Sequence, residues 1–142
     1  MDIKALAQDA APYVVERRHY YHQHPELTGE EKNTRDAIHR DLEALGITDI
    51  RDMVNCYGLV ATIHGGKTVG LRADTDALSF QEETGLPFAS CEPGKMHACG
   101  HDTHMPCCWA PPSSFRSTGR SCGAMCGSSS SRRRSTSSAL RL

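Results

Sequence analysis

The chain has 142 residues, of which 38% are hydrophobic and 23% are charged, and its formal net charge at pH 7 is −1. This length accommodates one domain, and this composition excludes a chain that is disordered throughout. The start, MDIKALAQDA, lacks the basic and apolar segments of a leader, and no window approaches the roughly 18 apolar residues of a membrane span. We therefore expect a cytoplasmic protein with no membrane partner.

The chain divides into two parts of unlike composition. All 17 acidic residues and all 8 histidines lie within residues 1–105, whereas residues 106–142 are rich in Ser, Arg and Cys and contain no acid. The second part has neither helical nor strand periodicity, so we expect an ordered part over 1–105 and a disordered tail over 106–142. The run Arg132 to Arg134 would suit a phosphate, but such a run is more often simply solvated, and we expect no nucleic-acid partner.

Apolar residues at helical spacing predict a first helix over residues 3–23. Asp2 is a suitable N-cap for this helix, Pro12 disturbs it, and Pro25 follows its end.

A second amphipathic helix follows Thr28 and Glu31, which have the spacing of a capping box. Its apolar stripe ends at Gly46, which occupies the usual position of a C-terminal cap. Both helices precede the first apolar runs that are typical of strands.

Two short apolar runs, residues 59–63 and 69–73, flank a Gly65-Gly66 turn signal and predict a β-hairpin or two neighbouring strands. Residues 79–95 contain prolines and glycines without a period and indicate a loop. A further helix should begin at Asp102 as its N-cap. Helices, strands, a loop and a new helix in this order are typical of the opening of an α/β domain.

The segment MHACGHDTHM, residues 96–105, contains five side chains that are able to bind a metal ion. Thiolate and imidazole are usual ligands of zinc, and Gly100 lets the backbone bring Cys99 and His101 onto one ion. A solvent-facing polar loop is the alternative, and the number of ligands disfavours it. The odd total of 7 cysteines, at irregular separations, favours reduced thiols over disulfides.

Asp74 and Asp76 lie where the second predicted strand ends, and their side chains share one side of the chain. Either carboxylate is able to bind a metal or to hold a ligating His in one tautomer. A turn that ends the strand explains the two residues equally well.

Three segments together carry a resemblance: RRHYYHQHPELTGEE, VGLRADTDALSFQEETGLPFAS and GKMHACGHDTHM. In this order and at these separations they closely resemble the hippurate hydrolase and indole-acetyl-amino-acid hydrolase branch of the aminoacylase-type metallopeptidases. The resemblance implies the N-terminal part of an α/β catalytic domain, with helices around a mixed sheet. It also implies a smaller lid or dimerisation domain, which this chain lacks.

In that branch, two divalent ions (Zn, Mn or Co) catalyse hydrolysis of the amide bond of N-acyl amino acids, which are small-molecule substrates. The resemblance makes Cys99 and His101 metal ligands and makes Asp76 a residue that supports the metal site without touching the metal. Asp74 lies where more distant relatives carry a ligating His. His97, Asp102 and His104 also match family positions, but we assign them no ligand role.

The family continues with an apolar helix and then a strand that ends in a Gln-Pro-Ala-Glu-Glu sequence with the general-base Glu, and this chain lacks both. In the reading frame one nucleotide back, the codons of residues 105–110 force Ala-x-Leu-Leu-Gly, with x limited to Leu, Met or Val. Ser130 to Ser135 are able to encode Gln-Pro-Ala-Glu-Glu in the same frame. We therefore interpret the tail as an out-of-frame continuation of the gene that begins at or just before Pro106.

Two functions follow for this sequence. The first is an amidohydrolase by family that is inactive as this chain, because the general-base Glu and three of five expected ligands are missing. The second is a metal-binding fragment without catalytic activity. A nucleophilic Cys99 is a third and weaker interpretation, because Cys-His catalysis needs only one base and leaves the other ligands unexplained.

Overall fold

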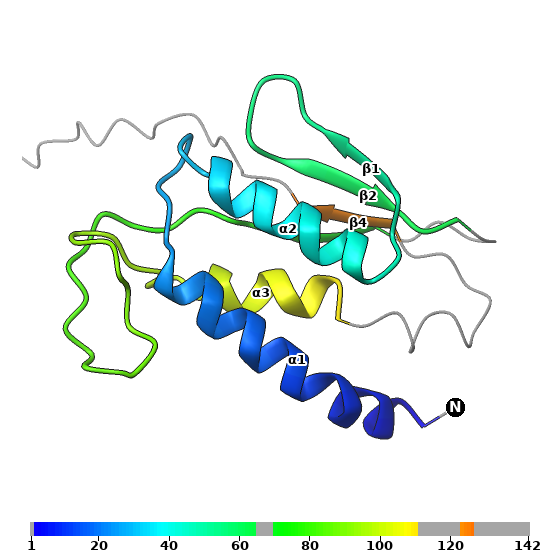
Figure 1. Ribbon diagram of the computed structural model, residues 1–142, viewed down its shortest axis with the longest axis horizontal. Coiled ribbons are helices and arrows are strands. Elements are labelled where there is room, and N and C mark those ends of the chain that lie inside the picture. The colour runs from blue at the N-terminus through cyan, green and yellow to red at the C-terminus, as the bar shows by residue number, and fades with distance from the viewer. Residues whose placement is uncertain (1, 65–69, 111–122, 127–142) are drawn as a thin grey trace, which may run out of the picture.

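The computed structural model describes residues 2–64, 70–110 and 123–126. Within these residues, three helices and four strands form one α/β arrangement (Figure 1). The strands of the sheet have the order β1-β2-β4-β3. The fold class predicted from the sequence is confirmed. No helix in the described residues is long and apolar enough to cross a membrane.

Helix α1 spans Ile3–Gln23, as the periodicity predicts, and continues through Pro12. The Asp2 carboxylate accepts hydrogen bonds from the backbone amides of Lys4 (3.0 Å) and Ala5 (3.3 Å). Asp2 therefore satisfies two of the amides that a helix leaves unpaired at its start.

Helix α2 spans Lys32–Ala44, but the predicted capping box is wrong. Thr28 donates its hydroxyl proton to Asp76 instead, at 2.6 Å. The carboxylate of Glu26 takes over the cap, because it accepts from the backbone amides of Asn33 (3.3 Å) and Thr34 (2.6 Å). Gly46 has φ +79°, as expected for the residue that ends such a helix.

Strands β1 (Asp49–Asp52) and β2 (Leu59–Thr62) form an antiparallel hairpin, and β1 was not predicted from the sequence. Strand β3 spans Gly70–Ala73, and β4 (Gly123–Cys126) lies between β2 and β3. Because β4 separates them, the expectation that β2 and β3 are neighbours is wrong. The predicted Gly65-Gly66 turn lies outside the described residues.

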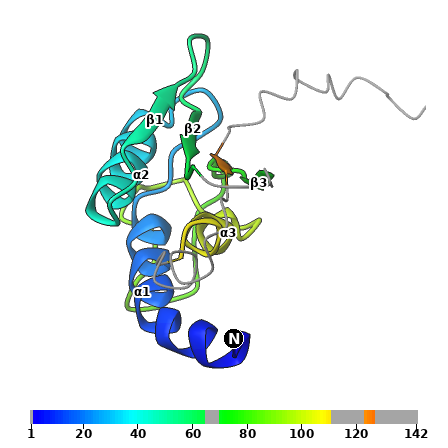
Figure 2. The same ribbon diagram turned by 90° about the vertical axis from the view of Figure 1, so that its right-hand side faces the viewer.

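Helix α3 spans His101–Cys108 and lies between α1 and the strands β3 and β4 (Figure 2). Two elements, α3 and β4, thus reach beyond residue 105. Met105 and Trp109 are buried in the core, which explains why the helix continues past that residue.

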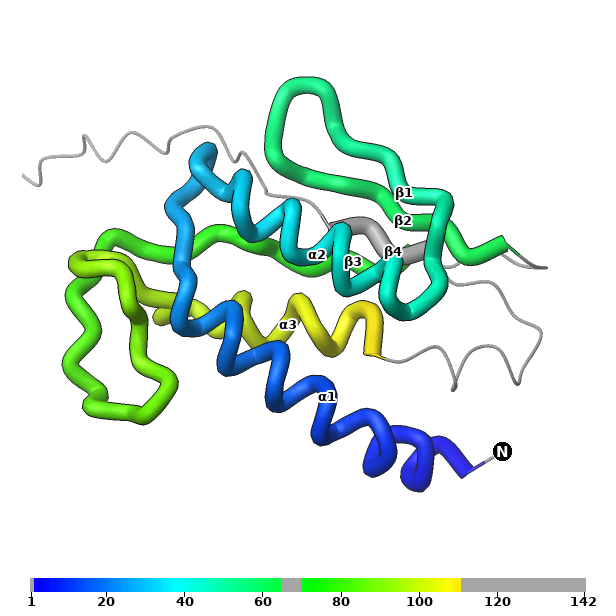
Figure 3. Tube along the Cα trace, in the orientation of Figure 1, coloured from blue at the N-terminus to red at the C-terminus, as the bar shows by residue number. Residues whose placement is uncertain are grey.

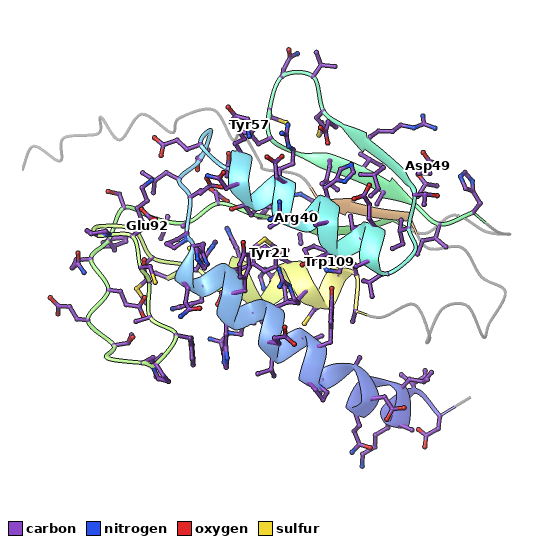
Figure 4. The ribbon with its side chains drawn as sticks, in the orientation of Figure 1. Tyr21, Arg40, Asp49, Tyr57, Glu92 and Trp109 are labelled. Carbon is purple, nitrogen blue, oxygen red and sulfur yellow. The ribbon has the colours of Figure 1, made fainter. Side chains whose placement is uncertain are left out.

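The hydrophobic core lies where the three helices meet the sheet. Tyr21 of α1 and Trp109 at the end of α3 point toward each other there, with their rings edge to face and the centroids 6.2 Å apart (Figure 4). The other members are Ala37, Ile38, Leu42, Ile47, Leu59, Ala61, Ala73, Met105 and Cys108. This core fixes α3, and so the loop that precedes it, against α1 and β3.

The segment between β3 and α3 contains no helix or extended strand over residues 79–95, as predicted. The backbones of Leu78 and Met96, which flank this segment, form two hydrogen bonds with each other, with N–O distances of 2.9 and 3.0 Å. The tube in Figure 3 shows the segment leaving the sheet, passing the C-terminal end of α1 and returning to α3. The backbone amide of Cys91 donates a hydrogen bond to the carbonyl oxygen of Gln23 at 2.9 Å, which anchors the segment to that helix end.

Candidate metal-binding loop

The loop that carries the predicted ligands ends at Gly100, whose φ of +79° is the left-handed conformation that glycine adopts most readily. Gly100 is the N-cap of α3, so the prediction that Asp102 caps this helix is wrong. His101 is the first residue of α3, and Cys99 lies just before the helix with an exposed side chain. The turn thus brings the two predicted ligands to the same end of one helix.

The His101 ring is held by Asp76, which follows β3. His101 Nδ1 donates to the backbone oxygen of Asp76 at 2.8 Å and lies 3.1 Å from its carboxylate Oδ1. Thr28 donates to the other carboxylate oxygen at 2.6 Å. A proton held on Nδ1 leaves Nε2 of His101 as the nitrogen with a lone pair for a metal ion. The sequence prediction had these two residues at one site, and the structure brings them into contact.

Asp74 does not join this contact. Its carboxylate pairs with Arg72 Nη2 of β3 at 2.5 Å. The two carboxylates at the strand end, Asp74 and Asp76, therefore have different partners. His104 is exposed one turn further along α3, with its ring centroid 5.9 Å from that of His101.

His97 belongs to the same segment and has 3% of its surface exposed, and neither ring nitrogen has a hydrogen-bond partner among the described residues. The pKa of His97 is lowered to about 4, chiefly by burial and to a smaller extent by the nearby His22 and His101, while the carboxylates of Asp102 and Asp76 oppose the shift. The ring is therefore uncharged at neutral pH, because a charged imidazole is costly to bury.

A second group of residues surrounds Asp102 and was not predicted from the sequence. Asp102 is 1% exposed and accepts from His22 of α1 and from Arg18 one turn earlier on the same helix. His22 also reaches Glu82 in the 79–95 segment. The only signal in the sequence was the density of basic and aromatic residues in RRHYYHQH, which does not reveal a partner 80 residues away.

The side chains of this loop supply some of the ligands that a transition metal needs. The thiol of Cys99 and Nε2 of His101 are the kinds of ligand that zinc prefers, and the exposed Cys99 is open to solvent. Within residues 2–64 and 70–110, however, no group of three or more His, Cys, Asp and Glu side chains is arranged to hold an ion. These residues therefore supply part of a ligand set.

The α/β arrangement of the described residues is structurally similar to the catalytic domains of M20 peptidases. A Bacillus subtilis protein described as a dinuclear metal-binding peptidase from the M20 family has this fold in its crystal structure. The TM-score is 0.77 at 33% sequence identity, and the match covers 86% of this chain and 36% of that one.

Sequence comparison agrees with the structural match. Residues 70–108 match the family described as Peptidase family M20/M25/M40. The chain is 38% identical over 105 residues to an N-acyl-L-amino acid amidohydrolase of Geobacillus stearothermophilus. It is 48% identical over 114 residues to an N-acetyl-L-cysteine deacetylase of Bacillus subtilis.

These matches support membership in the M20 peptidase family, of the amidohydrolase or aminoacylase type, so the chain is related to hydrolases. Each of the two sequence matches covers 72% of this chain but only 28% and 27% of the respective relative. The chain thus spans about a quarter of the length of the curated relatives it matches.

Proposed function

We propose that this chain carries the first part of a metal-dependent amidohydrolase that cleaves the amide bond of N-acyl amino acids. The observation that carries the proposal is the contact between His101 and Asp76, which leaves one nitrogen of His101 for a metal within the segment that matches the family. The names of two relatives, an N-acyl-L-amino acid amidohydrolase and an N-acetyl-L-cysteine deacetylase, support the substrate class. A hippurate-type substrate, as in the branch that the motifs resemble, is the narrower form of the proposal.

Cys99 and His101 would hold the metal, and Asp76 would orient the His101 ring. When bound, two divalent ions, of Zn, Mn or Co, would supply Lewis acidity to the amide carbonyl and the attacking water. Cys99 would bind as the thiolate, which favours zinc, whereas oxygen ligands from the rest of such a site would admit manganese or cobalt.

The general base for this reaction is a Glu that the chain as written does not contain, so we propose that the 142-residue chain does not turn over substrate. The reading frame one nucleotide back supports this, because it encodes Ala-x-Leu-Leu-Gly from residue 105 onward. Sequencing the gene across codons 100–110 tests the proposed frameshift, and a shifted frame interrupted by stop codons would contradict it.

A first experiment tests the ligands in the chain as it stands. Cobalt(II) added to the purified 142-residue protein should produce a thiolate-to-cobalt charge-transfer band, and Cys99→Ser should remove part of that band. His101→Ala should weaken cobalt binding, whereas His104→Ala, one turn along the same helix, should leave it within about threefold. An unchanged band in Cys99→Ser would exclude Cys99 as a ligand.

A second experiment tests the reaction. The frame-restored protein should hydrolyse hippurate or an N-acetyl amino acid, and a chelator should abolish the activity. The 142-residue chain should show no turnover in the same assay. Chelator-sensitive hydrolysis by the short chain would overturn the proposal that it is inactive.

A metal-binding fragment without catalysis is the second candidate for the chain as written. It is supported by the Cys99 and His101 loop, whose described surroundings supply only part of a ligand set. Cobalt binding without hydrolysis by the frame-restored protein would favour this candidate.

A further inference from the structure

A single buried imidazole joins three segments of the chain. His22 Nδ1 of α1 lies 2.8 Å from Asp102 Oδ2, and its Nε2 lies 3.2 Å from Glu82 Oε1. All three side chains are at most 6% exposed. The two nitrogens of one ring thus contact the carboxylates of two separate segments.

One end of this connection is the first turn of α3. Asp102 directly follows His101, and a carboxylate at this position also interacts favourably with the positive end of the helix dipole. Arg18 Nε lies 3.3 Å from the same oxygen that His22 contacts. Since Arg18 and His22 are four residues apart on α1, one face of that helix holds the start of α3.

The other end is the 79–95 segment. Glu82 accepts from the hydroxyl of Thr84 and, at 2.7 Å, from the backbone amide of Ser90, so its carboxylate organises the fold of the segment. Phe88 packs on α1, with its ring stacked on His19 at a centroid distance of 3.8 Å and edge to face with His22 at 5.6 Å. The segment therefore rests on the same face of α1 that holds Asp102.

We propose that His22 is a positioning residue for the metal-binding loop. By holding Asp102, it fixes the first turn of α3 against α1, directly after the Cys99-to-His101 turn. Its contact with Glu82 holds the 79–95 segment on the same helix and is not required for the position of the two ligands. The inference rests on the proposed function, since it assigns His22 to the same metal site. Substitution of a residue that orients a metal ligand without touching the metal typically lowers metal affinity by about 10- to 100-fold.

Two substitutions separate this role from a general contribution to packing. The amide nitrogen of Asn takes the place of His Nδ1, so His22→Asn keeps a donor toward Asp102. The amide nitrogen of Gln takes the place of Nε2, so His22→Gln keeps the contact with Glu82 and loses the one with Asp102. His19→Gln is the matched control on α1, because it removes the stacking on Phe88 without touching Asp102.

Cobalt titration of the full 142-residue chain measures the metal affinity of the loop. The signal to follow is the part of the thiolate-to-cobalt charge-transfer band that Cys99→Ser removes. His22→Gln should weaken cobalt binding at least about tenfold, whereas His22→Asn and His19→Gln should stay within about threefold of the parent. Equal affinities of His22→Gln and His22→Asn would overturn the proposal. A purely structural contribution would not distinguish the two variants.

Amide hydrogen exchange without metal measures the same connection independently of metal binding. His22→Gln should speed exchange over residues 97–104 and leave residues 32–44 unchanged. If the parent shows no Cys99 band but this local change occurs, the metal function is wrong and the structural connection stands. If exchange over 97–104 is unchanged, or if both segments change alike, the positioning role of His22 is refuted.

Discussion

Tyr21 connects the buried face of α1 to both the core and a carboxylate. It is 1% exposed, its ring meets Trp109, and its hydroxyl donates to Asp41 Oδ2 at 2.7 Å. Arg17 Nε reaches the same oxygen at 2.8 Å. Burial raises the pKa of Tyr21 well above its usual value, and the negative charge of Asp41 adds to the increase. The hydroxyl therefore stays protonated and acts as a donor.

Tyr21→Phe should lower the free energy of unfolding by about 1–2 kcal/mol, since it removes a hydrogen bond to a charged acceptor while Arg17 still pairs with Asp41. Urea denaturation at neutral pH measures this. Tyr20→Phe is the neighbouring control and should change stability by less than about 0.5 kcal/mol. Equal effects of the two substitutions would show that the Asp41 contact contributes nothing specific.

Glu82 should make the stability depend on pH in acid. Burial alone would raise the pKa of Glu82, but the hydrogen bonds donated by Thr84, Ser90 and His22 outweigh it and hold the pKa below 4.5. The folded protein therefore releases this proton more readily than the unfolded chain does. The resulting stabilisation is present above pH 4.5 and is lost as the pH falls through the lower folded pKa.

Glu82→Gln should accordingly be less stable than the parent at pH 7, and the difference should narrow below pH 4.5. Urea denaturation at several pH values between 3 and 7 measures this. Glu83→Gln, whose side chain is exposed, should show no such convergence. A difference that stays constant over the whole range would contradict the ionised state of Glu82 as its cause.

At the scale of elements, helix α2 owes its cap to a residue outside it. The carboxylate of Glu26 accepts from two backbone amides in the first turn, at Asn33 and Thr34, and from the Asn33 side chain at 2.8 Å. It also places a negative charge at the positive end of the helix dipole. A cap supplied from six or more residues upstream is invisible to rules that look for Ser, Thr or Asp at the boundary.

Glu26→Ala should destabilise the protein by about 1 kcal/mol, the usual effect of losing a helix cap. Faster amide exchange at Asn33 and Thr34 would locate the effect in the first turn of α2. Glu30→Ala is the control, since the exposed pair of Glu30 with Lys95 should contribute little. No difference between these variants would mean that the first turn is stabilised by packing alone.

Elements with a strong local signal were predictable from the sequence, and those that depend on distant partners were not. The helices α1 and α2, the strands β2 and β3, and the loop before α3 follow from apolar periodicity and from prolines and glycines. Strand β1 escaped prediction because its sequence, DIRD, is mostly charged and is held by pairing with β2. The start of α3 was misplaced because Gly100, in a left-handed conformation, replaces Asp102 as the cap.

The residues of the candidate site likewise fall into those that the sequence predicts and those that it does not. Cys99, His101 and Asp76 stood out by residue type and spacing, and the structure joins His101 to Asp76. Their roles toward a metal stay predictions. Arg18 and Glu82 were not found, because each contacts a residue far along the chain and neither carries a local motif.

At the scale of the whole molecule, the sheet depends on the strand that comes last among the described residues, β4. Strand β4 pairs antiparallel with β2 on one side and parallel with β3 on the other. Within the described residues, β3 has no other strand partner in the sheet. An isolated two-stranded hairpin such as β1-β2 is only marginally stable in water, so the sheet needs β4 for its integrity.

A chain that ends at Ala110 should therefore lose much of its cooperative unfolding transition, whereas a chain that ends at Ser130 retains β4 and should keep it. Chemical denaturation followed by circular dichroism compares the two. Amide exchange over residues 70–73 should rise to that of an unpaired strand only in the shorter chain. Identical transitions in the two truncated chains would show that β4 does not stabilise the sheet.

The order of the strands also bears on how the chain folds during synthesis. The β1-β2 hairpin and the helices before it close over short sequence distances and are able to form as soon as they leave the ribosome. Strand β3 has to wait until residues 123–126 emerge, about 50 residues later, and its edge is open to pairing with other chains in the meantime. A nascent chain stalled between residues 80 and 120 is thus the species most exposed to aggregation.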